Sequence, residues 1–477
     1  MTSEPPSSPQ APEPAQPPES APPSGSGSAP PSGSAPLAGS APLAGSAPLA
    51  GSAPPARPGR RGFLRGMGIA GGVVAGGIAG GAGGYALRGP GAVASPAAAA
   101  DAAMVRGLLP AVPFHGQHQA GILADPLPAT AVVSFNATAQ TRADLVDLFK
   151  TVTDRARFLT AGGTPPTVGI GGPPADSGTL GPTVVPDGLM VTFGVGSTLF
   201  DDRYGLASQL PAHLTPMRSF PNDDLDPAQC GGDLILHLTA GHQDVVLHAL
   251  RDIAKNTRGG MQANWRIDGF FSPARPTGTV PRNQQGFMDG ISNPSVTSAS
   301  QMNEHVWIQP GAAGEPAWTA GGSYLVVRLI RMFIEFWDRV DVYEQQLMIG
   351  RYRDTGCPLD ADRIYATPDY AKDPTGDVIP LNAHIRLANP RLPQTESSRI
   401  LRRGWSYDRG LDQVGDLDIG LVFTCYQQDI KRQFEAVQTR LINEPLIDYI
   451  SPFGGGYFLA LPGVTDSNDY FGRALLA

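Results

Sequence analysis

From Ala129 onward, the hydrophobic pattern of this 477-residue chain switches between the period of a β-strand and that of an α-helix. Residues 129–137 alternate as a strand, and residues 141–159 place their apolar side chains on one helix face. We then expect strands at residues 189–194, 232–240 and 262–270 and a helix at 242–255. The order β-α-β-β-α-β is typical of a ferredoxin-like unit.

The same order recurs in the second half of the chain. The expected strands are 324–331, 399–407, 417–426 and 456–461, and the expected helices are 336–348 and 430–442. The pattern therefore predicts an α+β fold with two ferredoxin-like halves, residues 105–285 and 286–477. The second half carries an insertion, residues 350–398, and an irregular segment of that length is usually functional.

The N-terminal residues have a different composition. Residues 1–59 are mainly Pro, Ala, Ser and Gly with a tandem GSAPLA repeat, which predicts a disordered leader. Residues 60–94 begin with Arg60-Arg61 followed by Phe63-Leu64, continue through a Gly/Ala-rich apolar run and end at Ala92-Val93-Ala94. That order resembles a twin-arginine signal peptide.

The signal peptide predicts export by the twin-arginine translocase to the periplasm or the extracellular space. A membrane anchor is the alternative, but the many glycines of the run make a poor membrane helix. The twin-arginine pathway carries folded proteins, which suits a protein that captures a cofactor before export.

Charge and cysteine content narrow the range of partners. The formal charge is −8, and the basic residues form no long stripe, so we do not expect nucleic acid as a partner. Cys230, Cys357 and Cys425 lie far apart without a CxxC pair, which favours free thiols over a zinc site or disulfides.

Among the eight histidines, His384 has the most informative surroundings. It lies inside the insertion in the sequence AHIRLANPR, where Arg386 could pair with a carboxylate of a cofactor and Asn389-Pro390 could form a turn. His115 and His118 are three residues apart, but they have no acidic or cysteine partner nearby. His213, His237, His242, His248 and His305 are isolated, so we expect none of these histidines to bind a metal.

Two further motifs carry polar groups that could act on a ligand. In GFMDG, Gly286 and Gly290 flank Asp289, so the backbone could approach a flat ligand and present the carboxylate. An ordinary Asp-Gly turn is the alternative. In LRRGW, strand alternation points Arg402 and Arg403 to opposite faces.

The three motifs together resemble the dye-decolourising haem peroxidases, in particular the exported deferrochelatase/peroxidase branch. The resemblance runs from HQAGI at His118 to the end of the chain and includes FGVG, GGSYLVVRLIRM, EPLIDY, PFGGGYFLALPG and NDYFGRALL. The order and spacing of these motifs make the resemblance specific. It implies two ferredoxin-like halves in a dimeric α/β barrel-like arrangement, with haem in the second half.

The resemblance also implies the roles of the site residues. His384 would be the axial ligand of the iron of one haem b per chain, with Glu444 or Asp448 as the acid that accepts its other ring proton. Gly286, Gly290 and Arg386 would contact the cofactor. Asp289 would carry a proton during peroxide reduction, and Arg402 would stabilise negative charge on the peroxide.

The expected activity is haem-dependent reduction of hydrogen peroxide with oxidation of dyes, phenolics or other bulky organic reductants, fastest at acidic pH. Surface radical sites could relay electrons, with aromatic core packing as the alternative for Trp307, Trp318, Trp337, Trp405, Tyr352 and Tyr407. Other functions within the resemblance are a deferrochelatase that releases iron from haem, working with iron-uptake partners, and a non-enzymatic periplasmic haem carrier. A homo-oligomer is compatible with all three functions.

Overall fold

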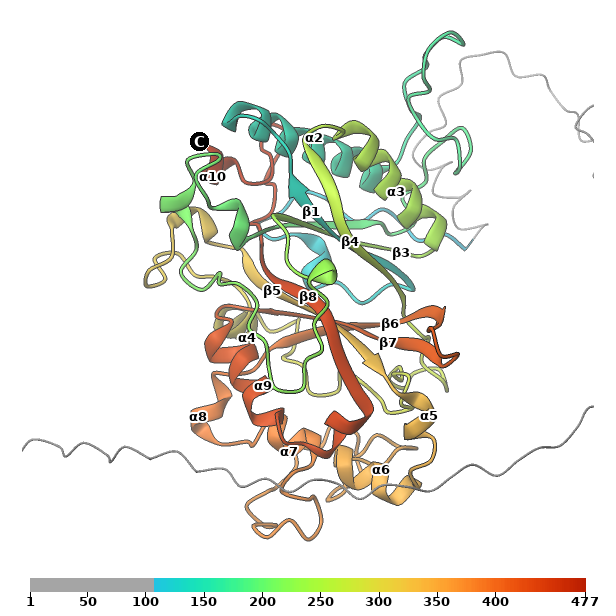
Figure 1. Cartoon of the computed structure of the whole chain (residues 1–477), viewed down its shortest axis with the longest axis vertical. Helices are drawn as coiled ribbons and strands as arrows, with labels where there is room; N and C mark the ends of the chain where they lie inside the picture. The colour runs from blue at the N-terminus through green and yellow to red at the C-terminus, as the bar shows by residue number, and fades with distance from the viewer. Residues whose placement is uncertain (1–106) are drawn as a thin grey trace, which may run out of the picture. The chain divides into compact units, whose positions relative to one another are not determined.

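A computed structural model describes residues 107–477, so the leader and signal-peptide predictions for residues 1–59 and 60–94 lie outside the described residues. Eight strands form a closed barrel in the order β1-β3-β2-β8-β5-β7-β6-β4 (Figure 1). The first four strands and the last four occupy opposite parts of this barrel. The chain therefore has the mixed α+β fold that the sequence predicts.

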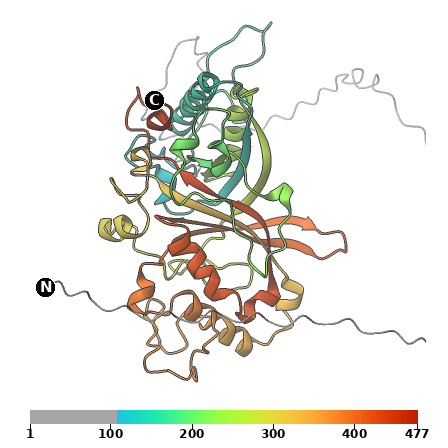
Figure 2. The ribbon, with the colours of Figure 1, turned by 60° about the vertical axis from the view of Figure 1, so that its left-hand side comes forward.

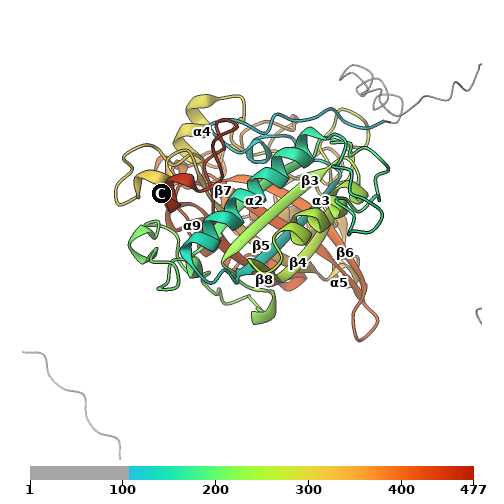
Figure 3. The same cartoon turned by 90° about the horizontal axis from the view of Figure 1, so that it is seen from above.

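The N-terminal part follows the predicted element order closely. Its elements are β1 (Ala129–Ala137), α2 (Arg142–Ala161), β2 (Met190–Gly196), β3 (Leu234–Ala240), α3 (Gln243–Asn256) and β4 (Met261–Phe270). Figure 3 looks onto α2 and α3, which lie over the strands of the N-terminal part. The predicted face of α2 is confirmed, because its apolar side chains are buried, and Thr141 and Asp144 close a capping box at its start.

The C-terminal part differs from the prediction at its helices. Its elements are α4 (Ala299–His305), β5 (Ser323–Met332), α5 (Ile334–Trp337), α6 (Val342–Ile349), α7 (His384–Ala388), α8 (Pro393–Glu396), β6 (Leu401–Leu411), β7 (Leu417–Gln427), α9 (Ala436–Leu441), β8 (Ile450–Ala460) and α10 (Arg473–Leu476). Figure 2 shows the β6–β7 hairpin projecting from the body of the barrel.

The predicted helix at 336–348 was wrong as one element. It is split into α5 and α6, because the Asp341 side chain accepts the Glu344 N–H and so begins a new helix. The predicted helix at 430–442 starts with a π-helical turn, Lys431–Glu435, before α9. Such wide turns are frequent at functional sites.

The two parts of the barrel meet at two short seams. Strand β2 pairs with β8 through three residue pairs, and β4 pairs with β6 only at Phe270 and Ser406. The glycines of FGVG allow the first seam, since a Cβ on Gly196 would lie 2.0 Å from the carbonyl oxygen of Gly232. The second seam leaves most of β6 without a partner on that side.

Alternation along the strands assigns side chains to the inside or outside of the barrel. Val132, Ile235, Leu325, Val327 and Phe458 belong to one buried cluster that fills the interior. The alternate residues face outward, toward α2 and α3 in the N-terminal part and toward the insertion and α9 in the C-terminal part. In the described part of the chain, no helix is long and apolar enough to cross a membrane.

Candidate functional site

A cavity of about 240 Å³ lies on the outer face of β5–β8, whereas another cavity near Phe471 has only about 10 Å³. The insertion, the loop that contains GFMDG and the π-helical turn with α9 form its other walls. Its apolar lining includes Ile330, Ile349, Leu421, Phe423, Phe434, Leu441 and Leu446. A hollow whose wall combines a mostly apolar surface with polar groups that converge on it is typical of a ligand site.

His384 begins the short helix α7 and lines this cavity. Its Nδ1 lies 2.6 Å from Oε2 of Glu444, which is buried. Burial alone lowers the pKa of His384, but the charge of Glu444 and the hydrogen bond to it raise that pKa above its ordinary value. A proton held on Nδ1 leaves Nε2 as the ring nitrogen that can bind a metal.

Of the two acids considered for His384, only Glu444 contacts it. Glu444 comes directly before the short helical segment Pro445–Tyr449, whereas Asp448 lies within that segment and is exposed. The sequence pattern could not separate these two acids, because both belong to the same motif.

Asp289 and Arg402 lie together on the cavity wall, with Asp289 Oδ1 accepting a hydrogen bond from Arg402 Nη1 at 3.0 Å. About a third of each side chain is exposed, 34% for Asp289 and 29% for Arg402. The Gly290 N–H donates to the same carboxylate oxygen at 2.6 Å. The carboxylate is therefore held in place but still accessible from the cavity.

Asn293 holds the backbone of Arg402. Its Oδ1 accepts the Arg402 N–H at 3.1 Å, and its Nδ2 donates to the Arg402 carbonyl at 2.9 Å. These two bonds replace the strand partner that β4 does not provide at this end of β6. Arg403 points the other way, as predicted, and donates to the carbonyls of Ile122 and Leu123 inside the barrel.

The two glycines of GFMDG differ in their surroundings. Both have positive φ angles, 85° for Gly286 and 88° for Gly290, which favours glycine at each position. Gly290 lines the cavity, but Gly286 does not, and a Cβ there would lie 2.8 Å from Nη2 of Arg353. The positive φ angle and the close approach of Arg353 both favour glycine at position 286, and its expected contact with a ligand stays a prediction.

Arg386 also occupies a different place from the expected one. Its Nη1 donates to Asp373 Oδ2 at 3.1 Å and to the Ile379 carbonyl at 2.7 Å, and it is not among the residues that line the cavity. In this arrangement the guanidinium is bound within the insertion, and the expected contact with a cofactor carboxylate stays a prediction.

Two other arginines could hold an anionic group in the cavity, and sequence reasoning missed both. Arg351 and Arg391 line the cavity, and in the part of the chain that the structure describes neither forms an ion pair with a carboxylate. Burial lowers the pKa of Arg351 to about 10, so it stays cationic at neutral pH. The sequence contained one indication of this role for Arg391, which belongs to the same AHIRLANPR motif as His384.

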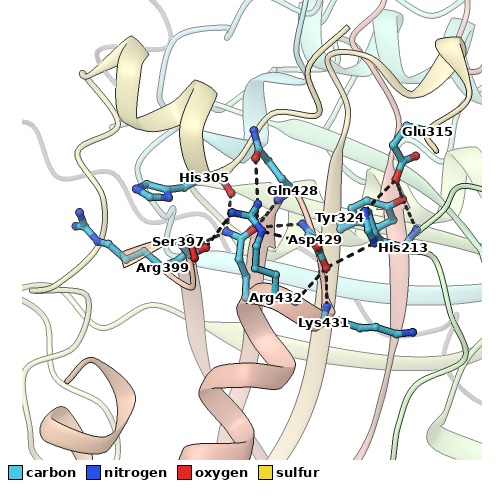
Figure 4. A network of polar contacts seen from close by, with 11 residues as sticks. His213, His305, Glu315, Tyr324, Ser397, Arg399, Gln428, Asp429, Lys431 and Arg432 are labelled. Carbon is cyan, nitrogen blue, oxygen red and sulfur yellow. Dashed lines mark hydrogen bonds and ion pairs between the residues drawn. The ribbon is translucent and has the colours of Figure 1, made fainter. Parts of the chain in front are cut away.

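A polar network fixes the end of the insertion against the π-helical turn (Figure 4). Arg432 donates to the Ser397 carbonyl at 3.2 Å and to Gln428 Oε1 at 3.2 Å. Gln433, which is fully buried, donates to the carbonyl of His305 and accepts the N–H groups of Gln428 and Asp429. This network joins the end of α4, the end of the insertion and the π-helical turn.

The other histidines and the aromatic residues named as radical sites do not line the cavity. His118 stacks on Trp307 at 3.7 Å between ring centres, and His237 is buried inside the barrel. Within residues 107–477, no group of three or more His, Cys, Asp or Glu side chains could hold a metal ion. The aromatic residues named as radical sites do not line the cavity, and all but Tyr352 are buried, which favours core packing.

The cavity fits a haem by the chemistry of its walls. His384 offers one free ring nitrogen for the iron, and apolar side chains offer a surface for the porphyrin. Arg351 and Arg391 offer two guanidiniums for the two propionates, which are carboxylates. Asp289 and Arg402 form a polar pair that could contact a small molecule bound to the iron.

Comparisons with known proteins agree with this arrangement. Residues 119–271 match the family model described as Dyp-type peroxidase, N-terminal, and residues 280–465 match Dyp-type peroxidase, C-terminal. The deferrochelatase of Escherichia coli K12 is 50% identical over 368 residues, covering 76% of this chain and 87% of that protein. The deferrochelatase of Yersinia pestis is 48% identical over 367 residues, with 76% and 84% covered.

Solved structures show the same similarity. A DyP-type peroxidase from Streptomyces coelicolor has 32% identity and a TM-score of 0.69, covering 77% of this chain and 97% of that chain. One from Cellulomonas bogoriensis has 33% identity and a TM-score of 0.69, with 77% and 98% covered.

Proposed function

Because the chain belongs to the Dyp-type peroxidase family, we propose that it binds haem b in the described cavity and acts as a deferrochelatase, releasing iron while the porphyrin ring stays intact. One observation favours deferrochelatase activity over the peroxidase activity that the sequence predicted. The relatives named deferrochelatase are 48–50% identical to this chain and are covered over 84–87% of their length.

The second candidate is the peroxidase activity itself, and the Asp289–Arg402 pair favours it. A carboxylate within hydrogen-bond reach of a guanidinium can accept and return a proton, while the guanidinium stabilises negative charge on a bound peroxide. A simple haem carrier would need His384 but would have no use for this pair.

The residues that would hold haem follow from the geometry. His384 would bind the iron, which supplies the redox and Lewis-acid chemistry, and Glu444 would keep the imidazole oriented with its proton on Nδ1. Arg351 and Arg391 would pair with the propionates. Each chain would hold one haem, in the C-terminal of two ferredoxin-like halves, residues 105–285 and 286–477.

Asp289 has a proton-carrying role in both candidate activities. Peroxide reduction would need a group that carries a proton between the two oxygens, and release of iron from haem would need a donor for the two protons that replace the metal. Asp289 and Glu444 are the carboxylic acids of the cavity wall, and Glu444 is engaged by His384. Asp289 is therefore the acid available for proton transfer.

The two activities differ in their products. Purified protein is loaded with haem, and one sample is followed by porphyrin fluorescence and an iron chelator, the other by bleaching of an anthraquinone dye with hydrogen peroxide. Deferrochelatase activity predicts free protoporphyrin and chelated iron in equal amounts. Dye bleaching with no protoporphyrin would leave peroxidase as the function, and neither product would favour a carrier.

A His384→Ala variant tests the haem site itself. It is expected to lose or loosen the haem and hence the Soret band, while far-UV circular dichroism stays unchanged. A wild-type protein that shows no Soret band after expression with a haem supply would contradict haem binding altogether.

We further propose export through the twin-arginine translocase to the periplasm or the extracellular space, on the pattern of residues 60–94. A deferrochelatase there would supply iron to uptake partners. Replacing Arg60 and Arg61 by lysine should retain the protein in the cytoplasm, as cell fractionation would show. An unchanged distribution would contradict this route.

A further inference from the structure

The insertion places a tyrosine in the cavity wall whose hydroxyl has no partner. Tyr370 lines the cavity, and its hydroxyl oxygen is buried and makes no hydrogen bond with the described residues. Buried hydroxyl groups in folded proteins almost always have a partner. The missing partner of Tyr370 is therefore expected to be a group that enters the cavity.

The charges around Tyr370 indicate the chemical class of the group that would bind its hydroxyl. Burial raises the pKa of Tyr370 to about 12, and the nearby positive charges of Arg391 and Arg351 oppose this rise. At neutral pH the phenol keeps its proton and can donate it in a hydrogen bond. One O–H donor beside two guanidiniums without carboxylate partners in the described chain is complementary to a carboxylate.

The guanidinium of Arg386 lies against the ring of Tyr370. Its guanidinium carbon is 4.8 Å from the centre of that ring, and its Nη2 donates to the Asp373 carbonyl at 2.7 Å. The Asp373 carboxylate also accepts the N–H groups of Asp377 at 2.7 Å and Ile379 at 2.9 Å. Arg386 thus ties α7, which carries His384, to the turn that follows Tyr370.

We propose that Tyr370 is a further ligand-binding residue of this cavity, whose hydroxyl donates a hydrogen bond to a propionate of the bound haem, and that Arg386 is the residue that positions it. This inference rests on the proposed haem binding. It gives Arg386 an indirect role toward the propionate, through the tyrosine that it covers.

The test measures how fast haem leaves the protein. Haem-loaded wild type and Tyr370→Phe are mixed with an excess of apomyoglobin, and the transfer is followed at the Soret band. A hydrogen bond to a charged acceptor predicts a dissociation rate roughly tenfold higher, or more, in Tyr370→Phe. Tyr365→Phe is the matched control, since Tyr365 is 71% exposed in the same insertion, and it should match the wild type.

Haem dimethyl ester tests the acceptor. Its carboxylates are esterified and carry no negative charge, so the difference between wild type and Tyr370→Phe should largely disappear. An equal difference with haem and with the ester would contradict the propionate as the partner. The melting temperature of the haem-free Tyr370→Phe variant should not fall, because the hydroxyl has no protein partner to lose.

Arg386→Lys tests the positioning role. Lysine keeps the charge but loses the planar group that covers the ring and its several donors, so haem should dissociate about as fast as from Tyr370→Phe. The double variant should be no faster than Tyr370→Phe alone, because Arg386 acts through Tyr370. Additive effects would contradict this positioning role.

The outcomes separate this inference from the proposed function. A wild-type protein without a Soret band would contradict haem binding itself. A wild type that binds haem, together with an unchanged dissociation rate in Tyr370→Phe, would overturn the inference and leave the proposed function standing. Should Arg386→Lys fail to fold, as circular dichroism would show, the Tyr370→Phe comparison still decides the hydrogen bond.

Discussion

At the scale of single residues, two carboxylates on the cavity wall have different environments. Glu444 is buried and bound to His384, whereas Asp289 is partly exposed and bound to Arg402. Glu444 is suited to orient His384, and Asp289 is suited to move protons at the cavity surface. Their replacement should therefore affect different measurements.

We expect Asp289→Asn to slow the reaction of haem-loaded protein with hydrogen peroxide by about 10²–10⁴-fold, the usual contribution of a positioned acid or base. Haem binding should be retained, because the amide keeps the size of the side chain. Stopped-flow absorbance with peroxide measures the rate, and the Soret band measures the bound haem. A variant that reacts as fast as wild type would exclude Asp289 from proton transfer.

Glu444→Gln should change the metal site instead. An amide accepts the His384 proton more weakly than a carboxylate does, so the imidazole becomes a poorer donor to iron. We expect the midpoint potential of the iron to rise and haem affinity or activity to fall by about 10–100-fold. Spectroelectrochemical titration checks the potential, with exposed Asp448→Asn as the control that should leave it unchanged.

At the scale of elements, the position of Arg402 depends on an incomplete strand pairing. Strand β6 pairs with β7 along its length but with β4 at one residue pair only. Asn293 provides the two hydrogen bonds that a neighbouring strand would make to Arg402. A side chain from the loop after GFMDG thus joins the two motifs that carry Asp289 and Arg402.

Asn293→Ala should therefore reduce the peroxide rate without removing haem, because the backbone of Arg402 loses both bonds. Two lost hydrogen bonds would also lower the free energy of unfolding by about 1–3 kcal/mol. Asn293→Asp keeps the acceptor for the Arg402 N–H and should lie between Ala and wild type. Stopped-flow kinetics and chemical denaturation measure the two effects, and an unchanged rate in Asn293→Ala would refute the coupling.

At the scale of the whole molecule, the barrel interior contains an ionisable group. His237 is buried and hydrogen-bonds to Thr130 Oγ1 at 3.1 Å, and burial lowers its pKa from 6.5 to about 4. Between these two pH values the unfolded chain binds a proton that the folded chain does not bind. Stability is therefore lost as the pH falls through this window.

The size of this loss can be tested. A pKa difference of this magnitude corresponds to roughly 3 kcal/mol of unfolding free energy at pH values below both pKa values. We expect His237→Gln to lose less stability between pH 6.5 and pH 4 than wild type in urea denaturation. Exposed His115→Gln is the control and should follow the wild type. Parallel curves for wild type and His237→Gln would contradict the prediction.

The amino-acid sequence by itself determined the order of the barrel strands, the opposite directions of Arg402 and Arg403 and the motifs around His384 and Asp289. These features depend on local periodicity and on neighbours in the chain, so they can be read without coordinates. The helix at 336–348 could not be predicted correctly, because one capping interaction at Asp341 outweighed a continuous apolar pattern.

Only the tertiary structure decided which charged groups meet. It placed Glu444 on His384 across 60 residues of sequence, bound Arg386 to Asp373, and left Arg351 and Arg391 to face the cavity. These ion pairs depend on how the insertion folds against the outer face of β5–β8. That packing decides which carboxylate lies within reach of each guanidinium. Spacing along the chain carries no information about these distances.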